Sequence, residues 1–499
     1  MNFMKICIYI CFAAFLLLFG CNKDKPEFNP DLKTVSGFKT TFPLDSTIVI
    51  FQLDTVRISP EIEGLEPQKS YSYEWILFSN NMPPEVISTE RNLNEPIGAK
   101  PDDGYYLSFS VIDDQTGVKH TVRNYVTIQG AFYEGWLVAN NVGNQGRLSF
   151  IRMDDEVFMT PLEDINHQKY PGKAVAAISA VNTGFGAEES LNQILYFNDA
   201  GLTIFNPDDF VQITDLNESF YDRISFTSKP YFDGTPLLTD LHLINGGDLL
   251  MAAGPFNPGY TPARKFSDRI EGDYSLFPFS FPGEFITAYY YDNLKKRFLT
   301  AAYNTRSVYV ANKANGATPG TDGYFNMNNV GKTMIAADYT RGYDYLSLMR
   351  DDNGYYIYSF NINTGFRSSF YRSLPQVPEV DDLRGFTASG AFRHAYYASR
   401  NKIYRIDASS GAVSLIYEFP SDREISDLKM FKLKNRSYIQ LASLQEQHNK
   451  LLAIALNNGE KGEVHYIYLN SLGDLDTSRK PKTFTGFGNI VSLDYRNPI

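Results

Sequence analysis

An unbroken apolar run of 14 residues, from position 6 to position 19, opens the chain and is followed by a charged stretch that contains proline. A helix needs about 20 apolar residues to cross a bilayer, so this run has the length of the hydrophobic part of a secretory signal. Lys5 supplies the positive charge before the run, and Gly20 is a small residue suited to a cleavage site. The pattern predicts a signal peptide over residues 1–20.

Cys21 would be the only cysteine of the cleaved chain, because Cys7 and Cys11 lie inside the signal segment. A lone thiol at the first residue of an exported protein is unusual unless it is modified. The sequence Leu18-Phe19-Gly20-Cys21 resembles the bacterial lipobox, although Phe19 is larger than the usual residue there. The resemblance implies lipidation of Cys21, and two or more acyl chains give stable membrane anchoring. The alternative is a plain signal peptide with a chance cysteine.

Residues 21–36 are polar and show no periodicity, which predicts a lipidated tether. Within them, Asn22-Lys23-Asp24-Lys25-Pro26-Glu27 resembles the charged signal that follows the lipidated cysteine in surface-exposed lipoproteins of Bacteroidetes-type bacteria. The resemblance implies an outer-membrane location on the extracellular side, with a periplasmic face as the alternative.

Short apolar segments separated by turn residues fill residues 37–130. The segment 105–111 alternates with a period of two, as a strand does when one face is buried and the other is wet. Strands are also expected at 47–51, 56–58 and 71–75. About 95 residues with this rhythm predict an immunoglobulin-like β-sandwich, here without a disulfide.

The details of this region resemble the PKD domain, in which a Tyr-x-Trp strand packs in the core and a Gly-x-Tyr strand leads into a Val-x-Asp turn. The matching residues are Tyr73, Trp75, Gly104, Tyr106, Val111 and Asp113. The glycine- and aspartate-rich loop that follows the tryptophan in that family is absent, which puts a loop-bound calcium in doubt. Trp75 is expected to fill the core rather than to stack on a ligand.

A different rhythm runs through residues 131–499, where a strand-like segment recurs and often ends in alanine. The segments begin at residues 136, 194, 249, 298, 345, 395 and 438, which gives steps of 58, 55, 49, 47, 50 and 43 residues. A four-stranded unit repeated at such intervals is typical of a propeller blade. The repeat predicts a seven-bladed β-propeller, whereas a string of small sandwiches is the alternative.

Two further features refine the propeller prediction. The recurrent small residues suggest inner strands crowded around a narrow axis. The closing stretch, residues 484–497, reads as a last strand that completes the first blade and locks the ring.

The net charge limits the kinds of molecule that the protein is expected to bind. The formal charge is −11, and it becomes −12 when removal of residues 1–20 takes away Lys5. An acidic protein has no electrostatic reason to bind nucleic acid or anionic lipid. No second long apolar run follows the first, and 34 Tyr with 37 Phe fit strand-rich structure.

Signatures of catalysis are missing. The sequence contains no His-Glu-x-x-His, Gly-x-Ser-x-Gly or phosphate-binding glycine loop, and its six histidines are far apart. His394 is expected to be a core or hydrogen-bonded residue rather than a base. Adjacent acids are expected to stabilise turns; they are Asp102-Asp103, Asp113-Asp114, Asp154-Asp155, Asp208-Asp209, Asp351-Asp352 and Asp381-Asp382. We therefore predict no catalytic residue, no metal ligand and no cofactor.

Aromatic clusters are the most plausible binding elements, although alternate side chains on a strand must point into the core. They are Tyr289-Tyr290-Tyr291, Tyr355-Tyr356, Tyr396-Tyr397 and the segment 275–285. Both tryptophans lie on expected core strands, and no residue is assigned to ligand binding.

The combination of features resembles the PKD-like family lipoproteins of Bacteroidetes, which are generally encoded beside SusC/SusD-type importers. The resemblance implies a non-enzymatic surface lipoprotein that captures a glycan or peptide nutrient, or an accessory subunit of such an importer. One alternative is a propeller-based hydrolase or lyase, with acids and histidines converging at the central cavity. Another is a structural adhesion module without a small-molecule pocket.

Overall fold

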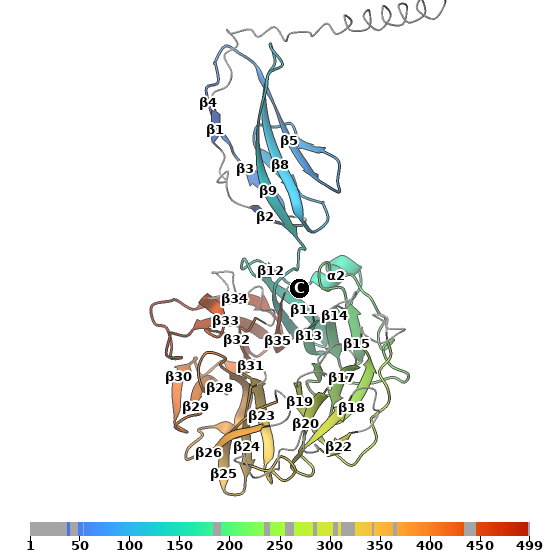
Figure 1. Ribbon diagram of the computed structural model, residues 1–499, viewed down its shortest axis with the longest axis vertical. Helices are drawn as coiled ribbons and strands as arrows, with labels where there is room; N and C mark the ends of the chain where they lie inside the picture. The colour runs from blue at the N-terminus through green and yellow to red at the C-terminus, as the bar shows by residue number, and fades with distance from the viewer. Residues whose placement is uncertain are drawn as a thin grey trace, which may run out of the picture. The chain divides into compact units, whose positions relative to one another are not determined.

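The computed structural model describes residues 37–39, 48–52, 54–182, 191–233, 240–254, 264–282, 287–302, 308–310, 325–341, 344–362, 367–433 and 446–497 (Figure 1). The chain divides into two compact units, Met1–Gln129 and Gly130–Ile499. Apart from the short helices α2 (Pro161–Asn166) and η2 (Val380–Asp382) and one turn near residue 446, the regular structure described is β. The signal segment 1–20, Cys21 and the tether to residue 36 lie outside the described residues.

The first unit is a β-sandwich. Its larger sheet has the order β2 (Ile48–Phe51), β9 (Lys119–Gln129), β8 (Asp102–Asp113), β5 (Tyr71–Ser79) and β6 (Glu85–Ser88). The shorter strands pair as β3 (Thr55–Ile58) with β7 (Leu93–Pro96), and β1 (Gly37–Lys39) with β4 (Glu61–Glu63). The predicted strands at 47–51, 56–58, 71–75 and 105–111 are therefore confirmed to within a few residues.

Trp75 is a core residue of the sandwich, as predicted. Its side chain is 2% exposed, its ring lies 4.4 Å from that of Phe109, and its indole N–H donates a 3.0 Å hydrogen bond to the Glu90 carbonyl. Asp113 ends β8 and accepts hydrogen bonds from the backbone of Gln115 and Thr116, which forms the expected turn.

The described part of the second unit forms seven antiparallel sheets, which confirms the seven-bladed β-propeller (Figure 1). The first four, from the innermost strand outward, are β35 (Asn489–Arg496), β10 (Gly135–Val142), β11 (Gln145–Arg152) and β12 (Val157–Phe158); β13 (Ala174–Asn182), β14 (Leu191–Asn198) and β15 (Gly201–Phe205); β16 (Tyr231–Asp233), β17 (Asp240–Asn245) and β18 (Asp248–Ala253); and β19 (Leu276–Pro282), β20 (Thr287–Asp292), β21 (Arg297–Ala302) and β22 (Tyr309–Val310).

The remaining three sheets each have four strands. They are β23 (Thr333–Tyr339), β24 (Asp344–Asp351), β25 (Gly354–Asn361) and β26 (Arg367–Leu374); β27 (Leu383–Ala388), β28 (His394–Ser399), β29 (Lys402–Asp407) and β30 (Val413–Glu418); and β31 (Glu424–Met430), β32 (Leu451–Asn458), β33 (Lys461–Tyr468) and β34 (Lys482–Phe487).

The last strand closes the ring. β35 pairs with β10 over the register Gly135↔Arg496 to Asn141↔Asn489, so the C-terminal segment completes the first sheet, as the sequence predicted. The predicted last strand, 484–497, is however two strands, because residues 484–487 belong to β34 of the seventh sheet. The seven innermost strands, β35, β13, β16, β19, β23, β27 and β31, then lie side by side in a closed ring.

The expectation that the recurrent small residues mark inner strands is wrong. The repeated segments lie on second or third strands, such as β10, β14, β18 and β21, and the segment that begins at Tyr438 lies outside the described residues. Ala139 of β10 is fully buried in one cluster with Ala174 and Ala177 of the next sheet. These small residues therefore allow adjacent blades to pack closely, rather than relieving crowding at the axis.

Among the residues that the structure describes, no helix has both the length and the apolar character needed to span a bilayer.

Candidate functional site

A cavity of about 390 Å³ occupies the centre of the propeller. Six of the seven innermost strands contribute to its lining, together with residues 229 and 230 just before β16. Ligand pockets are typically about 300–1,000 Å³, so this axial cavity is large enough for a small ligand.

Three aspartates of the lining connect neighbouring blades in the same way. Asp338 of β23 accepts a 2.8 Å hydrogen bond from the backbone N–H of Ala388 of β27. Asp427 of β31 accepts one of 2.9 Å from Leu493 of β35, and Asp494 of β35 accepts one of 2.8 Å from Ser179 of β13. Each carboxylate thus satisfies a donor on the adjacent innermost strand, where an unpaired backbone N–H would be costly.

Two of these aspartates also form ion pairs inside the unit. Lys229 Nζ lies 2.5 Å from Asp427 Oδ2, and Lys432 Nζ lies 2.5 Å from Asp338 Oδ2. Lys432 is only 6% exposed, and its ammonium lies 4.1 Å from the centre of the Tyr339 ring. Burial lowers the pKa of Lys432 despite the attraction of Asp338.

Lys429 completes the charged lining. Burial opposes its charge, but the combined attraction of Asp427, Asp494 and Asp338 outweighs that effect and raises the pKa of Lys429. Burial likewise disfavours the charge of Asp427, but Lys229 and Lys429 lower its pKa on balance. We call Lys229, Asp338, Asp427, Lys429, Lys432 and Asp494 the axial charge cluster. With lysines beside its carboxylates, the cluster is poorly suited to hold a metal cation.

The sequence prediction did not find the axial charge cluster. Each of its aspartates stands within a strand with no acid directly beside it, in the stretches Ile335–Tyr339, Ile425–Lys429 and Val491–Tyr495. A single buried acid in a strand costs free energy unless it is paired, so this pattern was the available signal.

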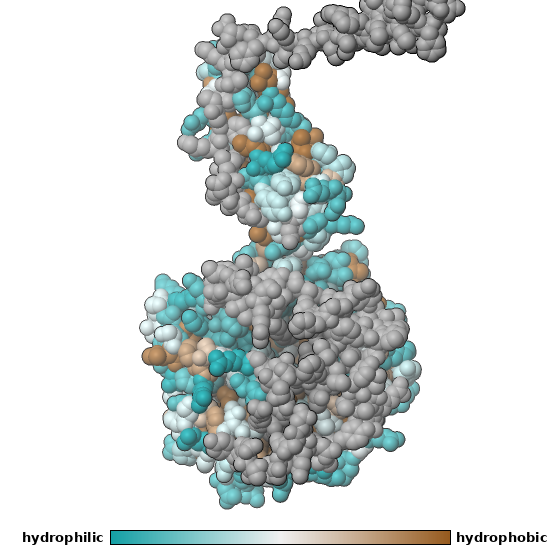
Figure 2. Space-filling model, in the orientation of Figure 1, coloured by the Kyte–Doolittle hydropathy of each residue, from teal (hydrophilic) through white to brown (hydrophobic). Residues whose placement is uncertain are grey.

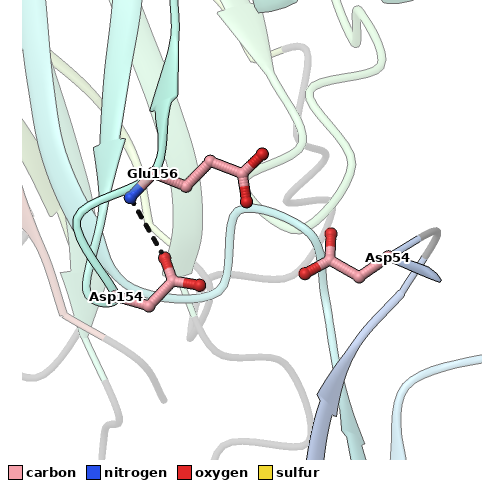
Figure 3. Close-up of side chains that lie close together, drawn as sticks. All are labelled: Asp54, Asp154 and Glu156. Atoms are coloured by element: carbon pink, nitrogen blue, oxygen red, sulfur yellow. Dashed lines mark hydrogen bonds between the residues drawn. The ribbon is translucent and has the colours of Figure 1, made fainter. Parts of the chain in front are cut away.

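Four of the six pairs of adjacent acids stabilise turns, as predicted. Asp154 Oδ1 accepts a 3.3 Å hydrogen bond from the Glu156 backbone (Figure 3), and Arg152 binds both carboxylates at 3.0 and 2.6 Å. Comparable turn bonds are made by Asp113, Asp209 and Asp351, whereas Asp102 accepts a hydrogen bond from the Gly104 backbone within β8. Asp382, from the remaining pair, binds Arg384 and Arg400.

The aromatic clusters divide into structural and cavity-lining groups. Tyr289, Tyr290 and Tyr291 of β20 are at most 4% exposed, and Tyr396 and Tyr397 of β28 are fully buried, so these two clusters are core. Tyr355 and Tyr356 are half-buried on β25 and do not line the cavity. From the segment 275–285, β19 brings Phe277 and Phe279 to the axial cavity; residues 283–285 lie outside the described residues.

Histidine is absent from the described cavity lining. His394 is half-buried beside Phe392 and Tyr396, and burial lowers its pKa. His242 is 4% exposed, and its Nδ1 lies 2.6 Å from the Tyr290 hydroxyl. Of the features expected for a propeller enzyme, the cavity therefore has converging acids but no histidine among its described residues.

The described outer surface of the second unit shows no comparable binding site on the face drawn in Figure 2. On the face drawn in Figure 2, the visible described residues of the second unit are mainly hydrophilic, and hydrophobic atoms form small separate patches. Isolated apolar side chains of this kind are normal on a soluble surface.

Comparison with known proteins gives the following likenesses. Residues 30–177 match the PKD-like family, a stretch that includes the sandwich and the first strands of the propeller. A quinonprotein alcohol dehydrogenase-like protein from Bacteroides thetaiotaomicron is 13% identical, with 91% of this chain and 97% of that chain covered and a TM-score of 0.45. The β-propeller domain of Nup133 from Vanderwaltozyma polyspora is 11% identical, with 60% and 85% covered and a TM-score of 0.30.

A DUF4784 family protein from Bacteroides caccae is 10% identical, with 93% of this chain and 100% of that chain covered and a TM-score of 0.29. No curated protein matches the sequence.

Proposed function

We propose that this protein is a non-enzymatic, lipid-anchored surface protein that captures a small nutrient, a glycan or a peptide, in the axial cavity of its propeller. The anchor is Cys21, the setting is the extracellular side of the outer membrane, and the captured ligand passes to a SusC/SusD-type importer. The observation that carries the capture role is the 390 Å³ cavity with its ionic lining.

The state of the charged groups supports binding rather than catalysis. A general acid or base needs a carboxylate free to exchange a proton with the substrate. Two of the three lining aspartates, Asp338 and Asp427, are instead each held by a lysine and by a backbone N–H, and Asp494 is held through one oxygen by the Ser179 backbone. Such fixed charges are suited to orienting a ligand in a cavity of low dielectric constant.

Native mass spectrometry tests the capture role without presupposing the ligand. The purified full chain is incubated with a mixed pool of short peptides and oligosaccharides, and the bound mass is read directly. Ala337 lines the cavity on β23, so Ala337→Trp should obstruct it. Leu415→Trp at an exposed position of β30 is the matched control. We expect a bound species with the wild type and the control but not with Ala337→Trp; binding that survives obstruction, or none at all, contradicts the proposal.

Fatty-acid labelling tests the anchor separately. Labelled palmitate should appear on the wild-type chain and not on Cys21→Ser, and protease added to intact cells should digest the anchored protein. Affinity purification of the anchored chain should also recover an importer subunit. Equal labelling of both chains would remove the membrane setting while leaving the cavity experiment interpretable.

A further inference from the structure

The charges of the axial cavity balance each other, but they are not all paired. Lys229 pairs with Asp427, and Lys432 pairs with Asp338. Arg384, also on the lining, is held outside this cluster by Asp382 at 2.7 Å. Lys429 and Asp494 remain, so the cavity presents one ammonium and one carboxylate beyond its internal ion pairs.

Neither remaining group has a side-chain partner within the described part of the chain. Lys429 makes no hydrogen bond or ion pair with a described residue, although three carboxylates attract it. Asp494 Oδ2 accepts the bond from Ser179, whereas Oδ1 accepts none from a described residue. Charged groups in a cavity are costly unless something binds them, so this pair is a place for complementary charges.

Charge balance selects the kind of ligand. The cluster holds three lysines and three aspartates, so its formal charge is zero. A ligand with a net charge would leave that charge without a counter-charge in the cavity. A zwitterion matches both open groups and keeps the sum at zero.

A neutral sugar fits the lining less well, because it carries no charge and would leave both Lys429 and Asp494 without a charged partner. The Thr387 hydroxyl already donates to Asp338 at 2.8 Å and accepts from the Met430 backbone at 3.3 Å. The Tyr495 hydroxyl donates to Glu134. These neutral groups of the lining are therefore committed to the protein.

The rest of the lining is apolar enough to receive a side chain. Phe277, Phe279 and Phe386 are half-buried around the cavity, and the ring of Phe279 lies 5.0 Å from that of Tyr231. Half-buried rings of this kind offer contact area to an aliphatic or aromatic group.

We infer that the axial cavity binds a zwitterionic ligand, a free amino acid or a short peptide with both ends uncapped. Its carboxylate lies at Lys429, its ammonium at Asp494, and its side chain against the phenylalanines. This inference rests on the proposed capture function and narrows its ligand to one chemical class.

Isothermal titration of the purified full chain tests the inference with three probes: the dipeptide Ala-Phe, the same dipeptide acetylated and amidated at its ends, and the disaccharide maltose. We expect Ala-Phe to bind, the capped peptide to bind at least tenfold more weakly, and maltose not to bind. Lys429→Met and Asp494→Asn should each weaken Ala-Phe at least tenfold. Lys461→Met, at an exposed position of β33 outside the lining, should change its affinity less than twofold.

A second comparison guards against loss of fold, because Asp494 also binds Ser179. A fourth probe, Ala-Phe amidated at its C-terminus only, should bind Lys429→Met as tightly as free Ala-Phe does, since the lysine that distinguishes the two peptides is gone. Binding of maltose without Ala-Phe, abolished by Ala337→Trp, overturns the zwitterion inference and leaves capture standing. Equal binding of capped and free peptide to the wild type overturns the inference too. If no member of the mixed pool of peptides and oligosaccharides binds, both proposals are wrong.

Discussion

Asp427 Oδ2 accepts a 2.9 Å hydrogen bond from the backbone N–H of Leu493, and this bond joins the seventh sheet to the strand that closes the first. The same carboxylate oxygen lies 2.5 Å from Lys229 Nζ. One side chain therefore takes part both in closing the ring and in lining the cavity. A substitution of Asp427 should therefore affect both the stability of the closed ring and the binding of a ligand in the cavity.

Removing that carboxylate should destabilise the propeller. Asp427→Ala leaves a buried N–H unpaired, which typically costs about 1–3 kcal/mol. Asp427→Asn keeps an oxygen that can accept from Leu493, so its loss should be smaller. Urea unfolding followed by Trp136 fluorescence in a Trp75→Phe background measures the propeller alone, because the chain has only these two tryptophans.

Asp352→Ala is the matched control, because Asp352 is exposed in a turn. Exposed substitutions usually change the free energy of unfolding by less than about 0.5 kcal/mol. Equal stability of Asp427→Ala and this control would show that the bond to Leu493 contributes nothing to ring closure.

The turn before β35 should tolerate no added side chain. A Cβ at Gly488 would lie 2.2 Å from the Asn141 carbonyl oxygen, a backbone atom of β10 that cannot easily move. We expect Gly488→Ala to destabilise the propeller by about 1–3 kcal/mol, the usual cost of overpacking. Gly98→Ala, which meets nothing within 4 Å, is the control. Thermal melts that coincide for the two variants would contradict the closure geometry.

The stability of the sandwich should depend on Trp75. Trp75→Ala removes a fully buried indole, which typically costs about 3–5 kcal/mol. Trp75→Phe keeps the contact with Phe109 but loses the bond to Glu90, so its cost should be near 1 kcal/mol, about that of one hydrogen bond. Urea unfolding followed by circular dichroism measures the free energy of unfolding of each variant and so ranks the two substitutions. If Trp75→Phe proves as damaging as Trp75→Ala, the hydrogen bond outweighs the packing.

Local patterns were enough to predict the architecture. Strand alternation in 105–111 requires only neighbouring residues, and the repeat requires only the spacing of similar segments. The closing strand could be placed because the stretch 484–497 reads as a strand that follows the last repeat. The prediction that the recurrent alanines lie on the innermost strands was wrong. Burial between blades and crowding at the axis both favour small residues, so the sequence pattern alone does not separate them.

The site was beyond local patterns because its partners are far apart in sequence. Lys229 and Asp427 are separated by 198 residues, and Asp338 and Lys432 by 94. Only the closed ring brings them together. The segment 275–285 was identified as a binding candidate because it is rich in phenylalanine. Two of those phenylalanines, Phe277 and Phe279, do line the axial cavity.

Glu134 should make the stability of the propeller depend on pH. Its side chain is 2% exposed, and burial raises its pKa from 4.5 to about 7, although the Tyr495 hydroxyl and Arg496 act in the opposite direction. Between pH 4.5 and 7 the folded state keeps a proton that the unfolded state has lost, so the contribution of Glu134 to stability falls as pH rises through this range. Glu134→Gln has no such proton to lose.

The difference in the free energy of unfolding between Glu134→Gln and the wild type isolates this effect. It should shift in favour of the variant by about 2 kcal/mol from pH 5 to pH 7 and level off above about pH 8. His242 titrates in the opposite sense, because burial lowers its pKa to about 4 and its contribution grows as pH rises. That term is common to both chains and cancels. His242→Gln should therefore show a difference of opposite slope, and a flat difference for Glu134→Gln would mean that its carboxylate is solvated in the folded protein.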